Sequence, residues 1–159
     1  MEHVVVERQD RGVHRHDPSA YLAVLPDLRE SLPPGARAFA CDPGHYDFQA
    51  PRCVKDLKLA ALPPALPAAS AGFELRLLCC RGEQEHGLTL RYTGVSEVDV
   101  TTDDGGPFDL GDVNSLRLDE ILPHPAGCTH ELRFTTATIR VTCADIVADW
   151  DPDPAPGAD

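Results

Sequence analysis

The sequence lacks the short motifs by which many enzyme and cofactor sites are recognised. It contains no serine nucleophile elbow, no glycine-rich phosphate loop and no His-Glu-x-x-His zinc motif. None of its six cysteines forms a Cys-x-x-Cys pair, so neither a zinc ribbon nor a thioredoxin-like site is indicated. We therefore expect no cofactor, no metal site and no catalytic residue that sequence alone can name.

Basic residues are also scarce. Lysine and arginine number 14 against 26 acidic residues, and the formal net charge is −12. Nucleic acid and anionic membrane surfaces both attract basic faces, so this balance argues against both as partners. It fits a protein that uses charge for solubility, or one whose partner is basic.

Long apolar runs are missing as well. No stretch approaches the roughly 20 apolar residues of a membrane span. The first ten residues, MEHVVVERQD, have neither the basic flank nor the apolar run of a signal peptide. We therefore expect a cytoplasmic protein with reduced thiols. Had a signal peptide been removed, the even cysteine count would favour disulfides instead.

The clearest positive signal is strict alternation of apolar and polar residues between residues 128 and 150. Leu132 and Phe134 alternate with polar neighbours, and so do Ile139, Val141 and Cys143. This period of two predicts a half-buried hairpin. A tight loop at Thr136-Ala137 would give the following cross-strand pairs: Phe134 with Ile139, Leu132 with Val141, and His130 with Cys143. Thr-Ala is a poor two-residue turn, so a longer loop stays open.

Similar alternation recurs along the chain and predicts a mainly β fold. We expect an antiparallel β-sandwich or curled sheet of about seven short strands, with a short N-terminal helical segment (α+β at most). The expected parts of the chain are a strand or arm at 1–16, one β-rich domain at 17–150 with helices at 17–32, and a disordered acidic tail at 151–159. We further expect Pro26 to break the helical segment, Pro33-Pro34-Gly35 to end it, 36–50 to begin with a strand, and 61–72 to be a surface loop.

Histidines next to acids are candidates for a site in the loops. Histidine with carboxylate is the material of general acid–base chemistry. The candidates are His45, Tyr46, Asp119, Glu120, His124 and His130. No spacing fixes them within reach of one another, so we favour the interpretation that they hold loop backbone in place. For His14-x-His16, two imidazoles on one face of a strand, we likewise favour an ordinary solvated segment over a metal site.

A run of acids offers a second kind of site. Glu97, Asp99, Asp103 and Asp104 lie on a predicted strand and the loop after it. Such runs are usually solvated faces, but they can also dock a basic protein, because complementary charge speeds association and selects partners.

Several short segments resemble small bacterial β-rich domains, some of which lie in toxin–immunity loci. The segments are HYDF (45–48), KDL (55–57), YTGV (92–95), DEILP (119–123), HELRF (130–134), and Cys143-x-Asp145-Ile146 with Trp150. The resemblance spans roughly residues 36–150. It implies a cytoplasmic binding or immunity role and brings no catalytic residues with it.

We therefore expect a non-enzymatic protein-binding domain, in one version an immunity protein that masks a basic toxin. Two alternatives stay open: a small enzyme or ligand-binding domain that uses the histidine–acid group, and a structural accessory subunit. We expect a monomer or small homo-oligomer.

Overall fold

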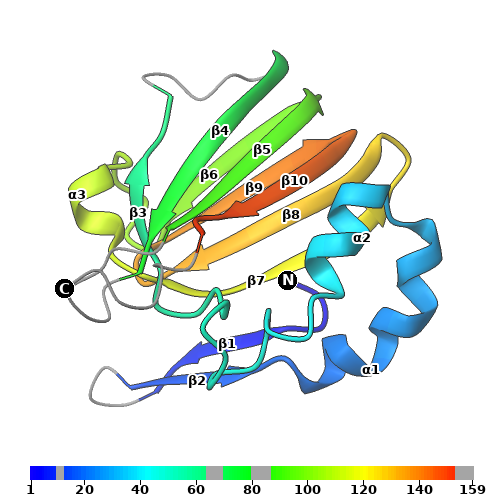
Figure 1. Ribbon diagram of the computed structural model, residues 1–159. Coiled ribbons are helices and arrows are strands. Elements are labelled where there is room, and N and C mark those ends of the chain that lie inside the picture. The colour runs from blue at the N-terminus through cyan, green and yellow to red at the C-terminus, as the bar shows by residue number, and fades with distance from the viewer. Residues whose placement is uncertain (10–12, 64–69, 80–86, 153–159) are drawn as a thin grey trace, which may run out of the picture.

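The computed structural model describes residues 1–9, 13–63, 70–79 and 87–152, and everything below refers to these ranges. They form a mainly β fold in which two four-stranded antiparallel sheets pack together, accompanied by a separate two-stranded hairpin (Figure 1). The predicted β-rich class is confirmed, although ten strands are present rather than about seven. The expected acidic tail lies largely outside the described residues.

The first sheet has the strand order β10-β5-β4-β3 and the second has the order β6-β9-β8-β7. The strands of the first sheet are β3 (Lys58–Ala61), β4 (Ser70–Leu78), β5 (Gly87–Val95) and β10 (Asp145–Trp150). Those of the second are β6 (Glu97–Thr102), β7 (Leu116–His124), β8 (Gly127–Phe134) and β9 (Ala137–Cys143).

The chain passes between the sheets at two tight corners. Ser96 is the only residue between β5 and β6, and Ala144 is the only one between β9 and β10. The Ser96 N–H donates to Thr142 O at 2.9 Å, and the Ala144 N–H donates to Thr93 O at 2.9 Å. These bonds join the corners to each other, so the two sheets are held face to face.

Side chains from the inner faces of both sheets form the core. In β8 and β9 every second residue points inward and is buried, as the two-residue period requires. Members from β4 and β5 are Leu75, Leu77, Leu88, Leu90 and Tyr92; members from β7, β8 and β9 are Ile121, Leu132, Phe134, Ile139 and Val141.

The β8–β9 hairpin has the predicted inward face but not the predicted register. Leu132 lies opposite Ile139 and His130 opposite Val141, whereas the sequence analysis paired Leu132 with Val141. The shift is two residues, because β8 ends at Phe134 and the turn takes in Thr135 and Thr136. A shift by an even number keeps the same side chains inward, which is why the face prediction survives. On the outer face, the observed register places Arg133 opposite Thr138 and Glu131 opposite Arg140.

Two helices cover one side of the sheets (Figure 1). Helix α1 (Ser19–Leu28) buries Tyr21 and Leu25, and the short 3-10 helix η2 (Arg29–Ser31) follows it. Pro26 lies inside α1, so the predicted break at this residue is wrong. Only Asp27 and Leu28 of α1 follow Pro26, and Leu25 and Leu28 on either side of it still pack against the core.

Helix α2 (Pro34–Ala40) occupies a segment for which we predicted a stop signal and a strand. Pro34 is at the start of the helix, where proline is tolerated because the N–H that it lacks would be unpaired there. The Asp145 carboxylate accepts the N–H groups of Gly35 (3.1 Å) and Ala36 (2.8 Å) and so satisfies that helix start. A Cβ at Gly35 would lie 2.2 Å from Ile146 O, so only glycine allows α2 to lie this close to β10.

The N-terminal segment forms a hairpin of β1 (Val5–Arg8) and β2 (His14–Asp17), which Figure 1 shows beside β7. A four-residue helix, α3 (Leu110–Val113), lies between β6 and β7. Of the predicted 61–72 loop, residues 64–69 lie outside the described residues, and residues 70–72 belong to β4.

Candidate functional site

Four side chains from separate parts of the chain form one buried polar network. His45 Nε2 lies 2.7 Å from Asp119 Oδ1, and His130 Nε2 lies 2.8 Å from Asp119 Oδ2. His130 Nδ1 is in turn 2.9 Å from the Tyr92 hydroxyl, and His45 Nδ1 is 2.9 Å from Phe39 O. Each imidazole therefore uses both ring nitrogens, and the carboxylate uses both oxygens.

The network bridges the layers of the fold. Asp119 and His130 lie on the inner face of the second sheet, Tyr92 lies on the facing sheet, and His45 comes from the loop after α2. The Tyr46 hydroxyl donates to Asp119 O at 3.1 Å, so this loop is attached to β7 twice. The phenol rings of Tyr21 and Tyr46 pack edge to face above it, with centroids 5.5 Å apart.

Burial determines what this network can do. The side chains of His45 and His130 are 0% exposed and that of Asp119 is 1% exposed. Burial alone would raise the pKa of Asp119, but the charges and hydrogen bonds of His45 and His130 outweigh it and hold that pKa below its usual range. A general acid or base must reach a substrate, and these groups reach only each other. The network therefore holds the loop after α2 against both sheets.

Glu120 points to the opposite face from Asp119 because successive strand residues alternate. Its carboxylate accepts the backbone N–H groups of Glu2 (2.6 Å), His3 (2.7 Å) and Val4 (2.6 Å). Only 2% of Glu120 is exposed. This carboxylate fixes the N-terminal segment on the outer face of the second sheet, so it too has a structural partner in place of a ligand.

The remaining predicted loop residue lies elsewhere. His124 is at the exposed end of β7, where its Nδ1 accepts the N–H of Ala126 at 3.1 Å in the turn to β8. The structure thus brings together His45, Tyr46, Asp119 and His130, places Glu120 behind them, and leaves His124 apart. Tyr92 completes the network; the sequence analysis placed it in the YTGV segment but not among the candidate site residues.

His14 and His16 lie on β2 with ring centroids 6.1 Å apart. Burial, followed by the charges of Lys55 and Arg117, lowers the pKa of His16 to about 4. Within the described residues, no group of three or more His, Cys, Asp or Glu side chains is placed to hold a metal ion.

The predicted acids lie along an exposed part of the second sheet. Glu97 and Asp99 are exposed on β6, an outer strand of that sheet, and Asp104 is exposed in the loop that follows. Asp103 differs, because its carboxylate forms a two-pronged ion pair with Arg133 at 2.7 and 2.9 Å. The hydrogen bond with Arg133 lowers the pKa of Asp103.

A second acidic segment adjoins the first. Thr136, in the β8–β9 turn, accepts the Asp103 N–H through its carbonyl (2.9 Å) and donates its hydroxyl to Asp112 O (2.7 Å). Asp109 and Asp112 of the α3 region therefore lie next to the Asp103 loop. We call the resulting surface the acidic edge; it consists of Glu97, Asp99, Asp103, Asp104, Asp109 and Asp112.

Neither a family model nor a curated protein matches this chain. In the part of the chain that the structure describes, every helix is too short or too polar to cross a membrane. The interpretation of this protein's function therefore depends on its own geometry.

Proposed function

We propose that this protein is a non-enzymatic binding domain whose acidic edge docks a basic protein. The observation that carries the proposal is the contrast between its two candidate sites. His45, Asp119 and His130 are sealed in the interior with their hydrogen bonds satisfied, whereas the acidic edge is exposed and carries charge that its own side chains do not fully neutralise.

The charge pattern supports this choice of partner. Of the acids on the edge, Asp103 alone forms an ion pair within the described residues, with Arg133. The formal net charge of −12 adds a long-range field of the same sign. Such a field attracts a basic protein and orients the encounter. An immunity protein that masks a basic toxin in the cytoplasm is the specific version that we favour.

The position of β6 supplies a second favourable feature. It is an outer strand of its sheet, with β9 on one side only. Outer strands present unpaired backbone groups that a partner can engage. Exposed carboxylates on the same strand keep two copies of this chain from joining there, because like charges would meet. A basic segment would meet no such repulsion.

Affinity purification of the tagged protein from its native host tests the proposal. We expect a basic protein to be retained at low salt and to be lost from a variant in which Glu97 and Asp99 are replaced by lysine. Retention of the same protein by that variant would exclude the acidic edge as the binding surface. Retention of no basic protein at all would contradict the proposed function.

A further inference from the structure

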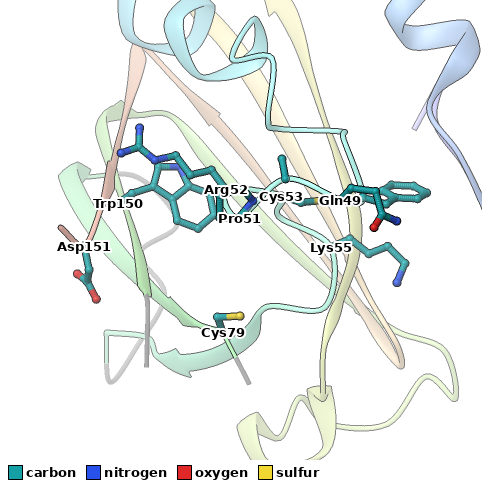
Figure 2. Close-up of a pocket in the computed structure, with 10 residues that line it drawn as sticks. Gln49, Pro51, Arg52, Cys53, Lys55, Cys79, Trp150 and Asp151 are labelled. Carbon is teal, nitrogen blue, oxygen red and sulfur yellow. The ribbon is translucent and has the colours of Figure 1, made fainter. Parts of the chain in front are cut away.

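A cavity of about 280 Å³ opens between the loop after α2, the end of β4 and the end of β10 (Figure 2). Ligand pockets of small molecules are concave and mostly apolar, with a few polar groups. This one matches that composition. Its lining residues are Phe48, Gln49, Ala50, Pro51, Arg52, Cys53, Lys55, Cys79, Trp150 and Asp151.

The loop that lines the cavity is held by its own hydrogen bonds. The Asp47 side chain accepts the N–H of Gln49 at 2.9 Å, and its carbonyl accepts the N–H of Ala50 at 2.9 Å. Cys53 N–H donates to Ala50 O at 3.2 Å, and the next residue, Val54, is fully buried. The cavity wall is therefore fixed before any ligand binds, which lowers the entropy cost of binding.

Trp150 lines the cavity from the first sheet. It is the last residue of β10, where it pairs with Leu88, and it is only partly buried. Figure 2 shows its indole at the same end of the cavity as Arg52. Both residues also line an adjoining cavity of about 310 Å³, so they stand between two hollows. A partly exposed indole offers an apolar face on which an aromatic ring can stack.

Arg52 is the uncompensated charge at this site. Eight of the described arginines form ion pairs, but exposed Arg52 has neither an ion pair nor a hydrogen bond within the described residues. Two nearby acids are already matched by cations, because Asp151 pairs with Arg76 and Asp149 pairs with Arg91. A third, Asp42 in the adjoining cavity, accepts the N–H of Gly44 at 2.7 Å and forms no ion pair with Arg52 within the described residues. In a protein with far more acids than bases, an unpaired guanidinium beside an aromatic cavity is suited to an anion.

We propose that this cavity binds a small aromatic carboxylate, with the ring against Trp150 and the carboxylate on Arg52. The guanidinium can donate two parallel hydrogen bonds to a carboxylate. Lys55 of the same loop is paired with Asp56 at 2.6 Å, which leaves Arg52 as the unpaired cation of the lining. The site is separate from the acidic edge, so this proposal stands or falls independently of the proposed function.

Trp150 is the only tryptophan in the chain, so its indole N–H gives a single resonance that reports on the cavity. The test is a titration of the isotope-labelled protein with benzoate, followed by nuclear magnetic resonance. We expect a saturable shift of this resonance. Benzamide, which has the same ring without the charge, should bind at least about tenfold more weakly, because a charge-assisted hydrogen bond is lost.

Three variants sharpen the test. R52Q should weaken benzoate binding at least about tenfold, and R140Q, which removes an exposed arginine on the other sheet, should leave the dissociation constant unchanged. C79F should abolish binding by filling the cavity, since Figure 2 shows the Cys79 side chain directed into it. Absence of a saturable indole shift in the wild type would overturn the proposal. So would equal affinity for benzoate and benzamide, or an unchanged dissociation constant in R52Q.

Discussion

His45 and Asp119 are 74 residues apart in the chain, yet His45 Nε2 and Asp119 Oδ1 lie 2.7 Å apart in the core. A second histidine, His130, binds the other carboxylate oxygen. The same residue types would suit acid–base chemistry on an open surface. Here Phe39, Tyr46 and Tyr92 surround them and exclude solvent. Their role is to join a loop and two sheets.

Replacing Asp119 with asparagine should destabilise the fold strongly. The variant leaves two buried imidazoles without their shared anion, and removing one partner of a buried ion pair typically costs about 3–5 kcal/mol of unfolding free energy. Urea denaturation measures the loss. Asp112→Asn is the control, because Asp112 is exposed, and it should change the free energy by less than about 0.5 kcal/mol. Similar values for both variants would contradict the structural role of the network.

The same carboxyl predicts a pH dependence. The folded-state pKa of Asp119 is lowered, so its stabilising contribution is complete above the unfolded pKa of about 3.9 and is lost as the pH falls below it. As the pH falls below about 3.9, the free energy of unfolding of Asp119→Asn should therefore decrease less than that of the wild type.

Phe134 and Arg133 are neighbours on β8 that point to opposite faces. Phe134 is fully buried, and Phe134→Ala should cost about 3–5 kcal/mol of unfolding free energy. Arg133→Ala removes a partly exposed ion pair with Asp103 and should cost about 1 kcal/mol or less. Chemical denaturation of the two variants compares the costs directly. Equal, small losses would show that β8 does not present this face to the core.

The sequence was sufficient to predict the faces of the hairpin but not its register. Leu132, Phe134, Ile139 and Val141 all point inward as alternation indicated. Alternation is unchanged by a two-residue shift, so only the turn could have set the register, and Thr135-Thr136 carries no strong turn signal. Helix α2 was missed for a related reason: Pro-Pro-Gly is equally consistent with a stop and with a start, and the carboxylate that favours a start, Asp145, is distant in sequence.

The buried network was beyond sequence reasoning for a different reason. His45, Asp119 and His130 were each singled out, but their convergence depends on how a loop after α2 meets the second sheet. Short-range patterns contain no information about such long-range contacts. Their burial was equally hidden, because a histidine beside an acid has the same signature on a surface as in a core.

His16 gives a second pH prediction, opposite in origin to that of Asp119. Burial and the nearby cations Lys55 and Arg117 lower its pKa to about 4, so the folded state binds a proton less readily than the unfolded state. The stabilising contribution of neutral His16 is present above about pH 6.5 and is lost as the pH falls toward 4. His16→Gln should flatten the fall in melting temperature over this range. His124→Gln, at an exposed position, should not.

Cys128 and Cys143 face each other across β8 and β9 with their sulfurs 3.7 Å apart. Their mutual hydrogen bond, together with burial, raises the pKa of Cys128, and a thiol is unreactive without its thiolate form. Exposed Cys41 should therefore react with iodoacetamide before Cys128 and Cys143, which should react only after unfolding. Peptide mass mapping identifies the labelled sites. Early labelling of Cys128 would contradict its burial.

Reducing agent should leave the melting temperature unchanged, because we expect all six thiols to be free. A clear fall with reductant would reveal a disulfide that holds the fold. It would also contradict the expected reducing compartment.

The acidic edge predicts how association with a basic partner depends on salt. Coulomb attraction between exposed charges is screened over a Debye length of about 10 Å at 0.1 M salt. Association should therefore slow as salt is added, whereas dissociation should change much less. Replacing both Glu97 and Asp99 with lysine should slow association at low salt and weaken its salt dependence. Charge reversal at exposed Asp27 on α1, which forms no ion pair within the described residues, is the control and should have a smaller effect. Asp103 is left intact because its ion pair with Arg133 would be lost as well.

Stopped-flow mixing with the copurified partner at two salt concentrations measures the association and dissociation rates, and melting curves verify that each variant is folded. If association proved independent of salt, or equally fast in the Glu97 and Asp99 variant, the charge on this edge would serve solubility alone.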